Sequence, residues 1–348
     1  MIRKILTMAM LCLALAVPAQ AMELTAPTVP AAGAERMPED VDSFGEAAAA
    51  ILMDALGRLR PDLREAVVSC TGVLAAVMAL ALLSAFPGHR KGVTELVGTL
   101  AVGGLLLRSA DSLISLGVDT VAELSGYGRL LLPVMTAALS AQGGITSATA
   151  LYTGTAVFDT ILSGLISKLL VPLLYFFLAL AAAYSALGDT MLKSLRDQIR
   201  GISIWGLKTL LYVYTGYISV TGVVSGTTDA GVLKAAKLTI SGVVPVVGSI
   251  LSDASEAVLV SATAVKNAAG IYGMAAILAV WIGPFVKIGV HYLILKGLAA
   301  VCGVFGVKSV TGLVGDFASV MGLLLAMTGA VCLMLLISTV CFLKGVGV

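Results

Sequence analysis

Long apolar stretches, separated by short polar ones, follow one another along most of this sequence. A helix needs about 20 nearly uncharged residues to cross the hydrocarbon core of a bilayer, and several stretches approach that length. They predict an all-α, polytopic integral membrane protein with about seven transmembrane helices, within a range of about six to eight. The predicted spans are 66–86, 93–107, 167–187, 202–225, 269–286, 288–306 and 317–343.

The composition of the chain agrees with a membrane protein. Hydrophobic residues make up 59% of it and charged residues 12%, whereas an ordinary soluble domain has about 45–50% apolar and about 25% charged residues. The net charge of +2 is too small to indicate nucleic-acid binding, and no basic run with interleaved aromatic residues occurs. The five cysteines form no CxxC pair; Cys12 is expected to leave with a signal peptide, and the other four are expected to pack as small hydrophobic residues.

Residues 1–21 have the three parts of a secretory signal peptide. A basic start is followed by an apolar run and by a small-x-small cleavage site at Ala19-Gln20-Ala21. Cleavage is expected before Met22, with an uncleaved anchor as the alternative. Either outcome places the following segment outside the cytoplasm.

Residues 22–65 are predicted to form an acidic extracytoplasmic segment. The part up to residue 42 is rich in proline and acidic residues, so we expect a flexible linker there. A short amphipathic helix follows, with Ser43 as its expected N-cap and Glu46 as its third residue. Pro61 is expected to end or restart this helix. Residues 66–348 then form the predicted membrane domain.

Basic residues beside the predicted spans indicate their orientation, since Lys and Arg gather in short cytoplasmic loops. The sequence His89-Arg90-Lys91 follows the first span, and Lys193, Arg196 and Arg200 follow the third. With the segment after the signal peptide outside, the predicted spans place both loops and Lys287 in the cytoplasm. The mature N-terminus is therefore expected outside the cytoplasm and the C-terminus inside.

Residues 241–270 are apolar enough for a membrane but carry too many polar groups to cross it simply. Asp253 and Glu256 lie on one face of a predicted amphipathic helix, because polar residues recur there at spacings of three and four. Such a helix lies in the membrane interface or lines a water-filled cavity, and both interpretations stay open. With the basic face after the third span, the candidate conduit or partner-contact residues are Pro245, Asp253, Glu256, Lys266, Asn267, Lys193, Arg196 and Arg200.

The same region carries a family resemblance. The run Val243-Val244-Pro245-Val246-Val247-Gly248, then Leu251-Ser252-Asp253-Ala254 and Lys266-Asn267, closely resembles the stage III sporulation protein AE family of endospore-forming bacteria. The resemblance extends over most of residues 60–348. It offers no catalytic, cofactor or metal residue to carry over to this chain.

The resemblance implies a role in sporulation. Members of the family look like membrane components of a secretion-like channel between the mother cell and the engulfed forespore. The implied location is the mother-cell membrane around the forespore, and the implied role is forespore development after engulfment. The implied partners are other membrane proteins of the stage III sporulation operon, a forespore-side channel protein and a separate ATPase.

Motifs for catalysis are absent from the sequence. It contains no GxxxxGK[ST] phosphate loop and no GxSxG elbow, and neither histidine has a partner at metal-ligand spacing. We therefore predict that the protein is no enzyme and uses no cofactor. Asp159 and Asp189 bracket a hydrophobic stretch, whereas aspartyl intramembrane proteases need their acids within the spans.

A secondary transporter for a small solute is the alternative function. Pro172 and Pro284 each interrupt a long apolar segment, which predicts either kinks, the favoured interpretation, or broken helices around a transport site. An offset of 112 residues aligns Pro133 with Pro245 and Pro172 with Pro284. This offset raises the hypothesis of a parallel repeat with halves 129–226 and 241–343. The basic face of Lys193 and its neighbours binds an acidic partner or, as the favoured alternative, anionic lipid head groups.

Overall fold

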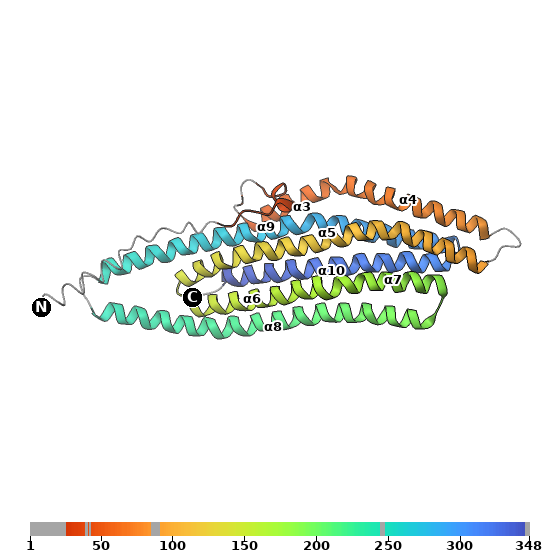
Figure 1. The fold of residues 1–348 in the computed structure, drawn as a ribbon. Coiled ribbons are helices and arrows are strands. Elements are labelled where there is room, and N and C mark those ends of the chain that lie inside the picture. Colours follow the sequence, from red (N-terminus) through yellow and green to blue (C-terminus); the bar gives the residue numbers. More distant parts are fainter. Residues whose placement is uncertain (1–25, 39–40, 42, 85–90, 244–247, 345–348) are drawn as a thin grey trace.

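The protein is a bundle of long helices that run nearly parallel or antiparallel to one another (Figure 1). A computed structural model describes residues 26–38, 41, 43–84, 91–243 and 248–344, with side chains described outside 84–94 and 221–262. Nearly all described residues are helical, and none of them lies in a strand. The predicted all-α membrane class is therefore confirmed, whereas the predicted signal peptide lies outside the described residues.

The helices differ greatly in length. The first two are short and lie on the side of the bundle, and the rest build it (Figure 1). In chain order they are α2 (Ala31–Ala34), α3 (Phe44–Gly57), α4 (Leu59–Ser84), α5 (Lys91–Ala141), α6 (Ile145–Leu165), the π-helical turn η1 (Ile166–Leu170), α7 (Val171–Leu187), α8 (Thr190–Val243), α9 (Gly248–Val304) and α10 (Lys308–Lys344).

Glycine ends three of the long helices. Gly143, Gly188 and Gly306 have φ angles of 89°, 73° and 76°. Side chains with a Cβ rarely adopt this left-handed conformation, whereas it is the common way for a helix to stop. The turns after α5, α7 and α9 therefore each depend on a glycine at that position in the sequence.

The N-terminal segment agrees with its prediction in part. The backbone N–H of Glu46 donates to Oγ of Ser43 at 3.3 Å, so the predicted N-cap is confirmed. Pro61 lies in the first turn of α4, where its missing N–H is tolerated. The expected linker is more ordered than predicted, because α2 packs on α9. Gly33 permits this contact, since a Cβ at that position would lie 2.7 Å from Val280.

Among the described residues, five helical segments are long and apolar enough to cross a membrane, whereas the whole sequence predicts about seven spans. The predicted spans 269–286 and 288–306 are one uninterrupted helix, α9, so their separation is wrong. The charge of Lys287 interrupts the apolar pattern, which is why the sequence predicts a loop there. In the structure its ammonium group lies 2.9 Å from the carboxylate of Glu65 in α4, and the helix continues through Lys287. The predicted span 93–107 likewise continues into the 51-residue helix α5. On its described residues, α8 is not among the five.

Both proline-containing segments continue as helix. Pro284 lies inside α9, and Pro172 lies in the first turn of α7, directly after η1. A π turn accommodates an extra residue within a helix, so residues 145–187 run on without a loop. The hypothesis of helices broken at these prolines is therefore wrong. The predicted repeat stays a prediction.

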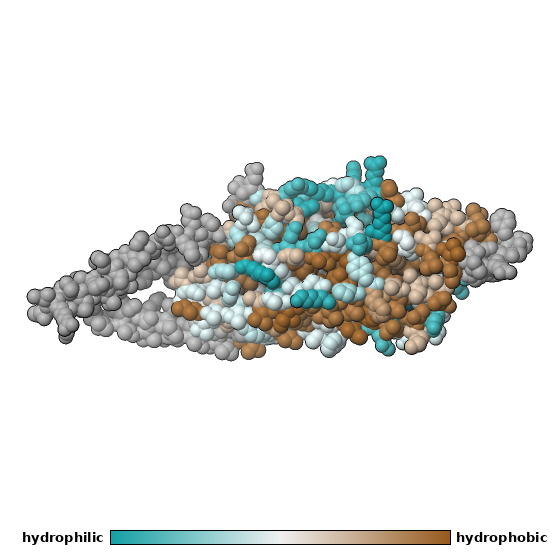
Figure 2. Space-filling model, viewed as in Figure 1, coloured by the Kyte–Doolittle hydropathy of each residue, from teal (hydrophilic) through white to brown (hydrophobic). Residues whose placement is uncertain are grey.

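The long helices exceed the thickness of a bilayer. Helices α8 and α9 contain 54 and 57 residues, which gives about 80 Å at about 1.5 Å per residue. A bilayer core is about 30 Å thick. The hairpin of α8 and α9 reaches well past the other helices (Figure 1). On the face seen in Figure 2, hydrophobic side chains predominate toward the opposite end, where α9 turns into α10.

Helix α10 forms the centre of the bundle. It contacts α5, α6, α7, α8 and α9, and most of its residues are buried. The hydroxyl groups of Thr328 and Thr339 donate to carbonyls four residues earlier in the same helix, whereas the hydroxyl of Ser338 lies 2.7 Å from that of Thr155 in α6.

Helix directions bear on the predicted topology. Helix α4 runs toward the end of the bundle where α9 turns into α10, and α10 runs away from it (Figure 1). If the bundle crosses the bilayer along its length, the start of α4 and the end of α10 face the same side. The hydropathy pattern and the signal peptide predict opposite sides, and the orientation of the two ends stays a prediction.

Candidate functional site

The predicted amphipathic region forms the first part of α9. Pro245 lies outside the described residues, and for Asp253 and Glu256 the structure describes only the helical backbone. Their role as conduit residues stays a prediction. Lys266 is 5% exposed, whereas Asn267 is exposed. These two neighbours therefore do not share one polar face.

The predicted basic face on α8 is divided by the fold. Arg196 lies 2.6 Å from Asp316 of α10 and 2.8 Å from Asp197, and its guanidinium stacks over the ring of Tyr184. Burial lowers the pKa of Arg196, but the hydrogen bond to Asp197 and the charge of Asp316 outweigh it and raise the pKa. Arg196 therefore holds α8 to α10.

Lys193 and Arg200 remain exposed on α8. They keep the surface position that the sequence analysis assigns to all three basic residues. Of the three basic residues, only Lys193 and Arg200 are therefore accessible to an acidic partner or to lipid head groups.

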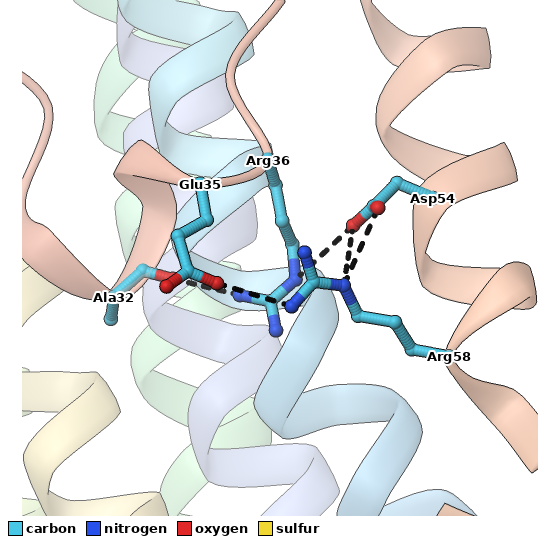
Figure 3. Close-up of polar contacts among 5 residues, drawn as sticks. All are labelled: Ala32, Glu35, Arg36, Asp54 and Arg58. Carbon is cyan, nitrogen blue, oxygen red and sulfur yellow. Dashed lines mark hydrogen bonds and ion pairs between the residues drawn. The ribbon is translucent and has the colours of Figure 1, made fainter. Parts of the chain in front are cut away.

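A network of ion pairs holds the parts of the N-terminal segment together (Figure 3). Arg58 lies 3.1 Å from both Glu35 and Asp54, and Nη1 of Arg36 donates to the carbonyl of Ala32 at 2.7 Å. Arg36 also lies against Gly283 of α9, where a Cβ would come within 2.6 Å of its guanidinium carbon. The ion pairs thus connect the end of α2 with the end of α3, and Arg36 packs this network against α9.

This network borders a cavity of about 590 Å³. The cavity lies between the N-terminal segment and the middle of α9, where Pro284 and Lys287 line it. The other charged residues along it are Glu35, Arg36, Arg58 and Asp62.

A second cavity, of about 310 Å³, adjoins the first at Lys287 and lies between α4, α5 and α9. Each helix contributes two polar residues four positions apart, which places the two on one face of the helix. The pairs are Glu65 and Ser69 on α4, Arg108 and Ser112 on α5, and Lys287 and His291 on α9. Ser109 completes the polar lining. Polar groups along apolar helices usually mark functional sites in membrane proteins.

A third polar cluster lies inside the bundle. Ser125 of α5 donates to the carboxylate of Asp159 at 2.9 Å, and Asp159 is 3% exposed. Asp189 is exposed at the start of α8, where its carboxylate accepts from the N–H of Met191. Of the two acids that bracket the hydrophobic stretch 160–188, Asp159 is therefore buried within the bundle and Asp189 lies on its surface.

Comparison with known proteins now decides the family. The sequence profile of the family described as Stage III sporulation protein AE matches residues 66–345. The chain belongs to this family. A curated relative, "Stage III sporulation protein AE" of Bacillus subtilis (strain 168), is 28% identical over 198 residues, which are 57% of this chain and 49% of that protein. The chain thus spans about half the length of the curated relative it matches. No solved structure matches.

The sequence analysis of this stage III sporulation protein AE family member missed the second cavity. It treats Lys287 as a loop residue and His291 as a lone histidine, and it does not single out Glu65 or Arg108. A pattern in the sequence could have indicated them, because each has a polar residue four positions away at the edge of an apolar stretch. That three such pairs meet is decided only by helix packing.

Proposed function

We propose that the protein is a structural, conduit-forming component of a multiprotein sporulation channel that links mother cell and forespore. Membership of the family implies a role in sporulation. The observation that carries the proposal further is the α8 and α9 hairpin, which is more than twice as long as a bilayer core is thick. A hairpin of that length projects from the membrane and suits a protein that bridges a space between two membranes.

The proposed orientation follows from the distribution of basic residues. Lys91, Lys193 and Lys308 all belong to the end where α4, α7 and α9 finish (Figure 1). Because Lys and Arg favour the cytoplasmic side, we assign this end to the mother-cell cytoplasm. The long hairpin, the N-terminal segment and the end of α10 then face the space between the membranes.

Cysteine accessibility tests this orientation. In a background without the native cysteines, single cysteines replace Met191, Ile145 or Lys344, which are all exposed. We expect a membrane-impermeant maleimide to label Ile145→Cys and Lys344→Cys from outside intact cells, and Met191→Cys only after permeabilisation. Labelling of Lys344→Cys from the cytoplasm alone would instead support the topology predicted from hydropathy.

The proposed role makes the protein one part of a larger assembly. We expect contacts with other membrane proteins of the stage III sporulation operon and with a forespore-side partner across the intermembrane space. The sequence contains no nucleotide-binding motif, so energy would come from a separate ATPase partner. The protein itself would act as structure and conduit and not as an enzyme.

Deletion of the gene from its endospore-forming host tests the function. We expect engulfment to finish and forespore development then to stop, because the forespore loses its connection to the mother cell. Fluorescence microscopy with a membrane dye and counts of heat-resistant spores measure the two stages. Reintroduction of the wild-type gene is the control and should restore spores. A normal spore count in the deletion strain would rule the proposal out.

A secondary transporter for a small solute is the second candidate function. The two cavities beside Lys287 favour it, because charged groups within a helix bundle often form a solute pathway. Uptake of a defined solute into proteoliposomes that contain this protein alone would support transport. The channel-component proposal instead expects no uptake without partners.

A further inference from the structure

The second cavity, between α4, α5 and α9, holds more hydrogen-bond donors than the protein uses. Nζ of Lys287 already contacts Glu65 at 2.9 Å, and Oγ of Ser69 donates to the carbonyl of Glu65. Among the described residues, no hydrogen bond or ion pair engages Arg108, and none engages the hydroxyls of Ser109 and Ser112. The cavity wall therefore keeps a guanidinium group and two hydroxyl groups available.

His291 is the most buried polar residue of this cavity, at 4% exposure. Its Nδ1 lies 2.9 Å from the carbonyl oxygen of Lys287, so Nδ1 carries the proton of that hydrogen bond. This bond fixes the imidazole ring against α9. The other ring nitrogen, Nε2, makes no hydrogen bond to the described residues and is left for a ligand.

The charge of the lining favours an anion. Arg108 and Lys287 carry positive charges, and Glu65 carries a single negative one. The Glu65 carboxylate is already occupied by the ammonium group of Lys287. A guanidinium fork beside hydroxyl donors is the arrangement that recognises phosphate oxygens.

The position of the cavity along the bundle indicates where that phosphate belongs. Glu65 directly precedes the uncharged stretch 66–84 of α4, and Arg108 directly follows the uncharged stretch 96–107 of α5. From the cavity to the end where α4 finishes, the helix runs about 20 residues, which is about the length that spans a bilayer core. The cavity thus lies one bilayer thickness from the basic end, at the depth of lipid head groups.

We propose that the cavity between α4, α5 and α9 is a phosphate-binding site, with Arg108 as its main anchor, Ser109 and Ser112 as further donors, and the fixed ring of His291 as part of its wall. The phosphate group belongs to an anionic lipid head group or to a free phosphate ligand, which share this chemistry. Basic pockets between transmembrane helices bind lipid head groups in the same manner. This site is independent of any channel activity, because it requires only the folded protein.

Binding to the purified full-length protein in a neutral detergent tests the proposal. The probes are inorganic phosphate, dioctanoyl phosphatidylglycerol and, as a lipid without phosphate, dioctanoylglycerol. We expect at least one phosphate-bearing probe to bind and dioctanoylglycerol not to bind. Arg108→Gln is expected to weaken that binding by about tenfold or more, because hydrogen bonds to a charged group are lost. Isothermal titration calorimetry measures the affinities.

Arg129→Gln is the matched control, since Arg129 is an exposed arginine on the same helix and does not line the cavity. Its affinity should stay within about twofold of wild type, because a change that small corresponds to less than about 0.5 kcal/mol. Ser112→Ala removes one donor without removing charge and should cause a smaller loss than Arg108→Gln. Size-exclusion chromatography and circular dichroism confirm that each variant is folded.

The outcomes distinguish the two sources of phosphate. Binding of phosphatidylglycerol alone assigns the site to lipid head groups, and binding of inorganic phosphate as well assigns it to a free anion. Equal affinities of Arg108→Gln and Arg129→Gln for the bound probe overturn the proposal, and so does an absence of binding by both phosphate-bearing probes. None of these results depends on sporulation, so they test the site separately from the proposed function.

Discussion

Replacing Gly154 by alanine is expected to destabilise the protein by about 1–3 kcal/mol, the usual cost of overfilling a packed core. Gly154 is buried in α6, and a Cβ there would overlap the ring of Tyr217 in α8. That ring cannot swing aside easily, because its hydroxyl donates to the carbonyl of Ala150 at 3.0 Å and the ring itself contacts that of Phe158. Helices α6 and α8 would have to separate. The apparent melting temperature in detergent measures the loss.

Gly164→Ala is the matched control for this prediction. It lies in the same helix, and a Cβ there would meet nothing within 4 Å. Alanine is the better helix former by about 1 kcal/mol, so this variant should be at least as stable as wild type. The double variant Gly154→Ala with Tyr217→Ala should be no less stable than Tyr217→Ala alone. Equal melting temperatures for Gly154→Ala and Gly164→Ala would contradict the close contact between α6 and α8.

Arg196→Ala is expected to cost about 3 kcal/mol, because it leaves the buried Asp316 carboxylate without its cation. The substitution also removes the contact of the guanidinium with Tyr184. Asp316→Ala should cost less, since Arg196 keeps its ion pair with Asp197 at 2.8 Å. The same melting experiment measures both variants. The difference between their melting temperatures reports the contribution of Asp197, the second ion-pair partner of Arg196.

Arg200→Ala is the control for this pair of variants. Arg200 lies one helical turn beyond Arg196 and is exposed. Its loss should change the stability by no more than about 0.5 kcal/mol. If Arg196→Ala were as stable as Arg200→Ala, the three basic residues of α8 would form one surface face, as their spacing alone predicts.

The local sequence predicted several parts of the fold correctly. The N-cap at Ser43 could be found from its spacing to Glu46, because capping depends on residues three positions apart. The helical membrane class follows from composition, since apolar residues at this density favour lipid over water. The family could be recognised from the motif around Pro245, and the profile match confirms it.

The errors share one physical origin. A hydropathy prediction averages over residues that are neighbours along the chain. It therefore places a boundary at Lys287 and predicts two spans where the structure has the single helix α9. In the fold this lysine meets Glu65, which is 222 residues away in the sequence, and the helix continues. Arg196 and Asp316 are 120 residues apart, so no spacing rule on α8 could separate Arg196 from its basic neighbours.

The sequence by itself determined that this chain is a helical membrane protein of a sporulation family, that a helix begins after Ser43, and that the chain lacks known catalytic motifs. Only the tertiary structure decided which charges are neutralised inside the bundle, that α9 stays whole, and that three polar helix faces meet at one cavity. The reason is physical: caps and apolar stretches depend on near neighbours, whereas the cost of a charge in lipid depends on the partner that packing brings to it.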